Sequence, residues 1–166
     1  MLTPVSRSPL IRYTHSRSTF ARRYAQLAEI TKCLAVRDRL PPGITSDDQQ
    51  QIMKFAATRW FHLLRDPRLA VLAMGSMVRM VLGVVEEGEE PVTVFSAHDS
   101  TLIGLICALR LRNPASWPEY ASCFKVEVFE GDLLRFSLNG EVLGCGIGGK
   151  EKDVVSVKEV REMLEQ

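Results

Sequence analysis

The chain has 166 residues, of which 46% are hydrophobic and 25% are charged, and its formal net charge is +1. This length is enough for one domain with a substantial core, and the near-neutral charge predicts no general affinity for nucleic acid or an anionic membrane. The most apolar stretch, residues 69–85, is interrupted by Arg79 and by glycines. Since a membrane span needs roughly 18 or more apolar residues, no span is predicted.

The N-terminal 28 residues differ from the rest in composition. They contain no acidic residue, the first being Glu29, and they carry Arg7, Arg12, Arg17, Arg22 and Arg23. With several Ser and Thr, this composition is typical of a mitochondrial transit peptide. The start of a truncated chain and a basic surface helix are the alternatives. A nucleic-acid-binding arm is disfavoured because the arginines and aromatic residues are not interleaved in a helical pattern. No apolar h-region follows Met1, so no secretory signal is predicted.

Two helices are predicted before residue 65. Apolar residues recur at helical spacing over about 20–34, and a Pro-Pro-Gly sequence at 41–43 then ends that pattern. The second helix is expected over about 47–64, with Thr45 or Ser46 as its N-cap. Its buried stripe is predicted to consist of Ile52, Phe55, Ala56, Trp60 and Leu63.

A third helix is predicted from Pro67 to about Glu87. Because it is apolar on most sides, we expect it to be buried between other elements. The β-branched and aromatic run at 91–96 then predicts a short buried strand, and a helix is expected over about 100–111.

A hairpin and a final helix are predicted in the last third of the chain. Apolar and polar residues alternate over 123–130, and residues 133–138 are rich in β-forming residues. These two runs flank a Gly-Asp turn signal. Asn139 and Gly140 predict a second turn. A helix over 156–165 is expected to start with Ser156 as N-cap and Glu159 as its capping-box partner.

These elements predict an α/β fold in which helices pack on a small mixed sheet. One strand of that sheet would end at His98 and Asp99, and the C-terminal hairpin would supply the others. So few strands would leave sheet edges exposed, and the long apolar helix would have little to pack against. The chain therefore resembles part of a larger α/β fold.

The polar pair His98 and Asp99 is the main candidate for a functional site. Ligands of α/β proteins bind just beyond the carboxyl ends of buried strands, and the free backbone N–H groups of a helix starting at Ser100 would attract an anion. Histidine can donate a hydrogen bond to that anion, and a carboxylic acid can protonate a leaving oxygen. The alternative interpretation is that Asp99 is an ordinary N-cap and His98 a loop residue.

The wider sequence resembles the histidine acid phosphatases, the branch of the histidine phosphatase superfamily that includes prostatic and lysosomal acid phosphatases and phytases. In that family a buried strand ends in Ser-Ala-His-Asp-x-Thr, and a helix, Pro-x-Tyr-Ala-Ser-Cys and a hairpin follow. The corresponding segments here are 96–101, 118–123 and the predicted hairpin, and the Leu-Pro loop at 40–45 is also similar. The resemblance covers about four-fifths of the chain, from Cys33 to the end.

The resemblance implies a hydrolase for phosphomonoesters that works through a phosphohistidine, without a metal or other cofactor. His98 matches the family's phosphate-binding histidine, and Asp99 matches the acid that protonates the leaving alcohol. The implied partners are a phosphomonoester or inorganic phosphate, and family members are usually secretory or lysosomal. We expect residues 29–166 to form the C-terminal part of such a domain.

The nucleophile of the family lies in an Arg-His-Gly-x-Arg motif that this sequence lacks. The nearest match, around His15, has neither the preceding Arg nor the Gly, and Arg17 comes one residue too soon. Proton donation alone is worth roughly 100- to 10,000-fold, so we predict little or no phosphatase activity for this chain alone. A truncated family member and a non-catalytic pseudoenzyme or interaction module are both consistent with the sequence, and the oligomeric state is open.

Cysteine positions add a further implication of the resemblance. Cys33 and Cys123 match a family disulfide, which would stabilise by on the order of 4 to 5 kcal/mol in an oxidising compartment; two thiols are the alternative. Cys107 is expected in the core, and Cys145 is expected to be unpaired. A metal-dependent HD phosphohydrolase is disfavoured, because that class carries the pair on a helix with further histidine ligands, and only His62 is available upstream.

Overall fold

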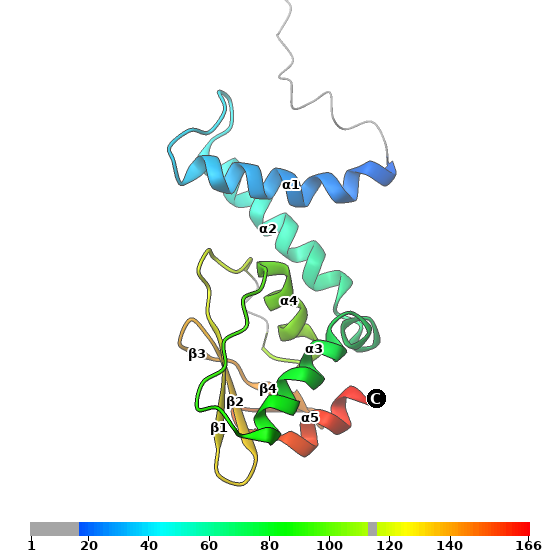
Figure 1. Cartoon of the computed structure of the whole chain (residues 1–166). Helices are drawn as coiled ribbons and strands as arrows, with labels where there is room; N and C mark the ends of the chain where they lie inside the picture. Colours follow the sequence, from blue (N-terminus) through cyan, green and yellow to red (C-terminus); the bar gives the residue numbers. More distant parts are fainter. Residues whose placement is uncertain (1–16, 113–115) are drawn as a thin grey trace, which may run out of the picture. The chain divides into compact units, whose positions relative to one another are not determined.

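The computed structural model describes residues 17–112 and 116–166, with side chains from residue 23 onward. These residues form five helices and two small sheets, so the predicted α/β class is confirmed (Figure 1). Every strand pair in these sheets is antiparallel, so the predicted mixed sheet is not formed. The chain divides into two compact units, Met1–Ala56 and Ala57–Gln166.

The first unit contains α1 (Arg17–Ala35) and most of α2 (Ser46–Leu63). The connection turns through Gly43, whose φ of 86° favours glycine. Thr45 caps α2: its hydroxyl accepts from the Asp48 N–H at 3.1 Å, and the Asp48 carboxylate accepts from the Thr45 N–H at 2.8 Å. The Tyr24 and Phe55 rings, 4.7 Å apart between centroids, join the two helices. Both predicted helices and the Thr45 cap are confirmed.

The predicted buried stripe of α2 is only partly correct. Ala56 is buried, but Leu63 is 59% exposed and Phe55 is also exposed. The buried residues are instead shifted by about one position toward the C-terminus, at Ala57, Phe61 and Leu64. Successive side chains of a helix point about 100° apart. Because α2 has apolar residues on several sides, their spacing alone does not show which side is buried.

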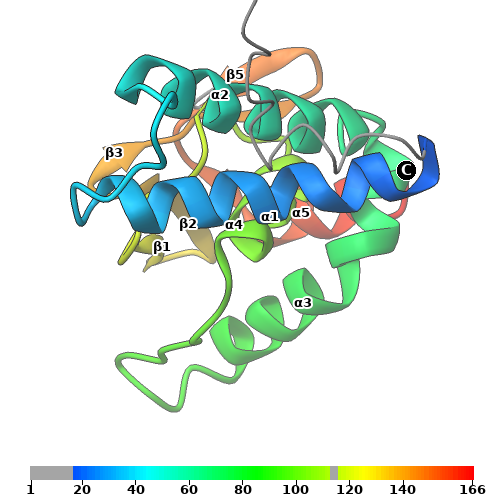
Figure 2. The same cartoon turned by 90° about the horizontal axis from the view of Figure 1, so that it is seen from above.

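In the second unit, α3 (Pro67–Glu87) packs against α4 (Asp99–Ala108) and α5 (Val157–Leu164), as Figures 1 and 2 show. Asp66 caps α3, with its side chain accepting from the Arg68 N–H at 3.0 Å, and Gly88 ends the helix in the left-handed conformation. The predicted bounds of α3 are therefore confirmed.

The expectation that α3 is buried on most sides is wrong. Its buried residues are Ala70, Gly75, Val78 and Leu82, which lie on one face, whereas Leu72 is 84% exposed and Leu69 and Met80 are also exposed. The reason is that, among the described elements, those that pack most closely against α3 are α4 and α5, and they cover the face that carries the buried residues. Within the described residues, α3 is the one helix whose length and apolar composition would suffice to cross a membrane, a test that core helices also pass.

The predicted strand over 91–96 is not formed, so no strand ends at His98 and Asp99. Residues 91–98 are all exposed and outside regular structure, and they run as a single trace from α3 to α4 in Figures 1 and 2. A β-branched run becomes a strand only when a neighbouring backbone pairs with it. No strand of the described chain pairs with this run.

The predicted hairpin is confirmed as β1 (Phe124–Phe129) and β2 (Leu133–Leu138), paired from Phe124 opposite Leu138 to Phe129 opposite Leu133. Gly131 and Asp132 turn the chain with φ of 79° and 56°. The Asn139-Gly140 turn is also confirmed, since φ is positive at both residues, as a two-residue hairpin turn requires.

Four short strands complete the sheets and were not predicted. β3 (Glu141–Val142) and β6 (Val155–Ser156) pair with β2, while β4 (Cys145–Ile147) and β5 (Lys150–Lys152) form a separate hairpin. The α5 cap is as predicted, with Ser156 and Glu159 in a reciprocal capping box. Fully buried side chains of β2, α4 and α5, among them Leu134, Ile106 and Val160, form the core of this unit.

Candidate functional site

His98 and Asp99 lie together where α4 begins. His98 occupies the N-cap position with extended backbone (φ −88°, ψ 160°), and its exposed imidazole makes no capping hydrogen bond. Asp99 is the first residue of the helix and is partly buried. The alternative in which Asp99 is the N-cap is therefore wrong, because its neighbour holds that position.

Both carboxylate oxygens of Asp99 have hydrogen-bond donors. Oδ1 accepts from the Ser100 backbone N–H at 2.7 Å, and Oδ2 accepts from the Trp117 indole Nε1–H at 2.5 Å. Trp117 is buried, and its ring lies edge-on to Trp60, with centroids 6.4 Å apart and an angle of 81° between planes. A packed tryptophan pair therefore holds the carboxylate in one orientation.

Trp117 is the residue of this site that the sequence analysis did not identify. It lies in a segment outside regular structure, 18 residues after Asp99. Its neighbours at 118–123 formed part of the resemblance, but no spacing rule connects an indole to a carboxylate at that distance in sequence. The one available signal was that a buried Trp needs a partner for its N–H.

The start of α4 does not offer the free backbone N–H groups that the sequence analysis expected to bind an anion. Its Ser100 N–H is taken by Asp99, and the N–H groups of Thr101 and Leu102 both donate to the His98 carbonyl, at 3.0 and 3.3 Å. A carboxylate thus already occupies the positive end of the helix. A phosphate beside it would rely on His98 and on further cations to offset the charge of Asp99.

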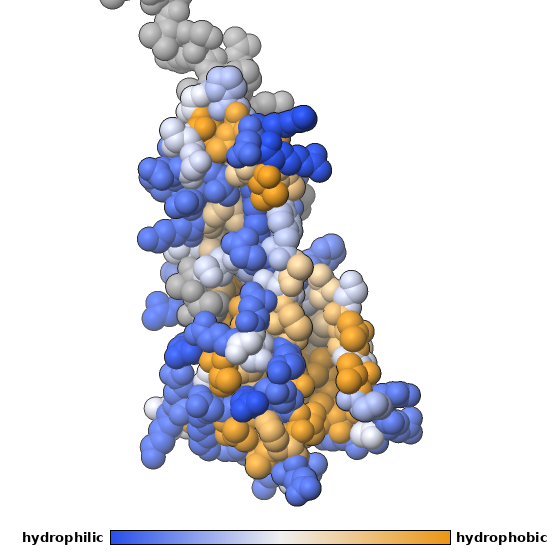
Figure 3. Space-filling model, turned by 90° about the vertical axis from the view of Figure 1, so that its left-hand side faces the viewer, coloured by the Kyte–Doolittle hydropathy of each residue, from blue (hydrophilic) through white to orange (hydrophobic). Residues whose placement is uncertain are grey.

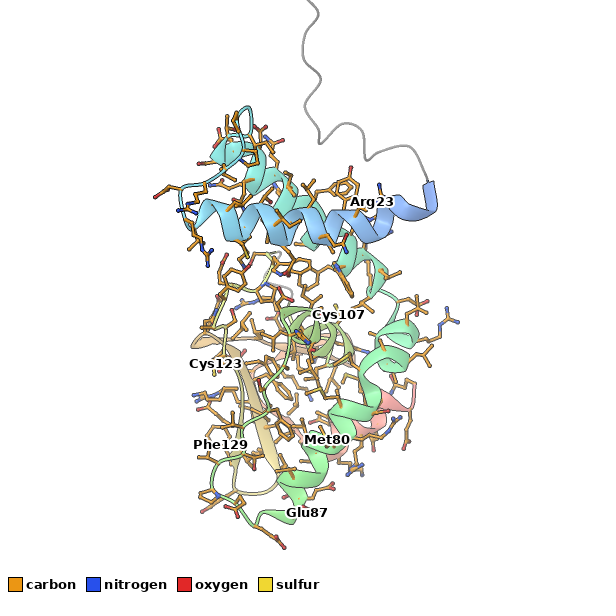
Figure 4. The ribbon with its side chains drawn as sticks, turned by 45° about the horizontal axis from the view of Figure 1, so that its top comes forward. Arg23, Met80, Glu87, Cys107, Cys123 and Phe129 are labelled. Carbon is orange, nitrogen blue, oxygen red and sulfur yellow. The ribbon has the colours of Figure 1, made fainter. Side chains whose placement is uncertain are left out.

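No disulfide joins any cysteines of the described chain. Cys33 and Cys123 are both exposed, and the bond between them implied by the resemblance is not formed in this structure and stays a prediction. Burial raises the pKa of the Cys107 and Cys145 thiols to about 11. Neither thiol is suited to nucleophilic chemistry near neutral pH, because that chemistry requires the thiolate. Figure 4 shows Cys107 on α4 and Cys123 near the hairpin.

Two further sequence-based candidates concern the nucleophile and a metal. His15 lies outside the described residues. Within residues 17–112 and 116–166, no three His, Cys, Asp or Glu side chains gather as metal ligands.

The site therefore comprises an exposed imidazole, a carboxylate with fixed orientation, and the tryptophan pair that fixes it. The imidazole of His98 can bind an oxyanion, and the carboxyl of Asp99 can exchange a proton. Comparison of the sequence with protein-family models and with curated proteins finds no match.

Proposed function

We propose that His98 and Asp99 form part of a phosphomonoesterase site of the histidine acid phosphatase kind. His98 binds the phosphate, and Asp99 protonates the leaving alcohol. The observation that carries the proposal is that Trp117 orients the Asp99 carboxylate at the start of α4, while the preceding residue, His98, has an exposed imidazole, within the motif at 96–101 that resembles the family.

The hydrogen bonds of Asp99 are compatible with proton donation. A carboxylate has about four lone-pair sites, and the Ser100 and Trp117 donors occupy one on each oxygen. Each oxygen therefore keeps a lone-pair site that a substrate can approach, while Trp117 holds the carboxyl in position. In the proposed role, proton transfer from this carboxyl to a leaving oxygen contributes roughly 100- to 10,000-fold to a rate when the substrate is held.

The covalent step needs a second histidine as nucleophile, which the family carries in Arg-His-Gly-x-Arg and which this sequence lacks. We therefore propose that this chain alone binds phosphate without efficient turnover. The test is an assay with p-nitrophenyl phosphate near pH 5, where little or no activity is expected. Robust turnover that Asp99→Asn abolishes would contradict the proposal that this chain alone lacks efficient turnover.

Phosphate binding tests the proposal directly. Inorganic phosphate should shift the imidazole NMR signals of His98, and His98→Ala should remove saturable binding. His62→Ala is the matched control, because His62 is also exposed and belongs to the same unit. A response of His62 equal to that of His98 would show non-specific binding and reject the site.

A second candidate, a non-catalytic interaction module, is favoured by the exposed apolar residues Val92, Val94 and Leu72. Such a module would be monodisperse and unfold cooperatively, and it would show no saturable phosphate binding. A fragment that exposes its core would instead bind hydrophobic dyes and aggregate.

A further inference from the structure

Residues 92–97 (VTVFSA), here called the docking segment, have the composition of a strand but none of its hydrogen bonds. No backbone N–H or C=O of these six residues is hydrogen-bonded within the described chain. They contain no Pro or Gly, and Val, Thr and Phe are residues that favour strands. The backbone of the docking segment is therefore available to pair with another chain.

The side chains of the docking segment are also uncovered. Val92 is 77% exposed, Val94 is 84% exposed and Phe95 is 38% exposed. Figure 3 shows apolar side chains gathered around a hollow on one face of this unit. Unpaired backbone beside exposed apolar side chains is what strand addition recognises: main-chain hydrogen bonds give affinity and alternate side chains give specificity.

Negative charges next to the docking segment indicate which charge a partner strand should carry. Glu87, Glu89 and Glu90 precede it, all exposed and without an ion pair within the described residues. Glu86 differs, because its carboxylate pairs with Arg161. Figure 4 shows Glu87 at the C-terminal end of α3. A partner strand would thus meet three carboxylates at one end, where Lys or Arg would be favourable.

We propose that the docking segment binds an extended segment of a partner protein, apolar at alternate positions and carrying Lys or Arg at the end beside Glu87, Glu89 and Glu90. This inference goes beyond the proposed phosphatase site and requires neither His98 nor Asp99 to act on phosphate.

Binding of a second copy of this chain to the docking segment is disfavoured, because like charges would then lie close together. Antiparallel pairing with Val94 opposite Phe95 of the other copy would bring Glu90 toward Asp99 at the start of α4, and this would happen twice by symmetry. Parallel in-register pairing would place each glutamate opposite itself. Like charges directly across a strand pair are destabilising, so the acidic residues oppose self-association and select a basic partner.

The experiment measures fluorescence anisotropy of labelled peptides with the full chain. The probe is a Thr-Val-Thr-Val-Thr-Val peptide with two lysines at its N-terminus, and a second peptide carries them at its C-terminus, so that the preferred strand direction is read out. We expect one lysine peptide to bind about threefold to tenfold more tightly than its two-glutamate counterpart. A peptide with a central proline should not bind, because it breaks the hydrogen-bond ladder.

Variants of the full chain locate the binding. Val94→Pro should weaken peptide binding at least about tenfold, because it removes a backbone donor that the free chain does not use. Val94→Ser should weaken it less, and Leu72→Ser is the matched control, since Leu72 is equally exposed but lies on α3. Glu89→Lys with Glu90→Lys should reverse the charge preference, whereas Glu130→Lys at the hairpin turn should not.

Hydrogen exchange provides a readout that does not depend on the variants. In the free chain the amides of 93–97 should exchange rapidly, and the lysine peptide should protect them. Protection in the free chain would overturn the proposal, and a dimer in sedimentation with protected amides would identify a second copy as the occupant instead. Failure of every peptide to bind at about 1 mM, the weak end of the usual affinity scale, would also overturn it.

Discussion

The indole Nε1–H of Trp117 donates to Oδ2 of Asp99 at 2.5 Å and thereby joins the start of α4 to a segment 18 residues later. Replacing Trp117 by Phe keeps an aromatic ring beside Trp60 but removes this donor. We expect Trp117→Phe to lower the free energy of unfolding by about 1 to 3 kcal/mol, because a partly buried oxygen loses its partner. Urea denaturation measures this loss.

A double-mutant cycle separates that hydrogen bond from general packing. If the two side chains interact as described, Asp99→Asn and Trp117→Phe should be non-additive by about 0.5 kcal/mol or more. Effects that simply add would show that Trp117 acts only through its volume.

Two helical glycines make a matched pair for testing how α3 and α4 pack. A Cβ on Gly104 would lie 2.5 Å from Cγ of Met74, whereas a Cβ on Gly83 would meet nothing within 4 Å. Gly104→Ala should therefore destabilise by about 1 to 3 kcal/mol through overpacking, and Gly83→Ala should stabilise by roughly 0.5 to 1 kcal/mol through helix propensity. Equal shifts in thermal midpoint for the two variants would argue against this close approach.

The capping box of α5 predicts a pH dependence of stability. Glu159 has its pKa lowered to about 2, first by the hydrogen bond from Lys152 and then by the Ser156 backbone N–H and hydroxyl. Its contribution to stability is fully present above the ordinary pKa of 4.5 and is lost as the pH falls from there through about 2.

Glu159→Gln should therefore flatten the fall in urea midpoint between about pH 5 and pH 2. Glu162→Gln on the same helix is the control, because Glu162 lies outside the capping box. A Glu159→Gln profile parallel to that of the unmodified chain would disprove the linkage.

Thiol reactivity distinguishes buried from exposed cysteines. At pH 8 in the reduced native chain, iodoacetamide should modify the exposed Cys123 well before Cys107 or Cys145, because burial raises the pKa of both of those thiols to about 11. Cys145 is restrained further, since its Sγ–H donates to the Leu109 carbonyl. Peptide mass spectrometry gives the order, and equal rates at all sites would contradict it.

Non-reducing mass spectrometry of protein oxidised before digestion tests the bond between Cys33 and Cys123 implied by the family resemblance. A linked peptide pair is the expected result. Reduced thiols at both positions after oxidation would contradict the disulfide that the resemblance implies.

Local signals in the sequence predicted local structure correctly. Pro67 and Glu87 mark the ends of α3, Asn139 and Gly140 form their turn, and Ser156 caps α5 with Glu159. In each case the residues that decide the structure are within a few positions of one another. The sequence predicts hydrogen bonds and backbone preferences between residues this close together, because no distant part of the chain is needed to form them.

Predictions that depend on distant partners were less successful. The run at 91–96 has strand composition, yet nothing in the described chain pairs with it, so the strand is not formed. Leu63 and Leu72 are exposed for a related reason, because apolar spacing does not say which neighbours are available to cover a face. The adjacency of His98 and Asp99 was evident from sequence, but the contact with Trp117 depends on tertiary structure.

The close fit between Gly104 and Met74 leaves little room for any chemical change at the Met74 sulfur. A sulfoxide at Met74 would add a polar oxygen where the two helices leave almost no room. Such damage would force α4 away from α3 and move the helix that begins with Asp99. If Met74 were oxidised, we would expect the start of α4 to shift, and the shift to be reversed wherever a sulfoxide reductase is present.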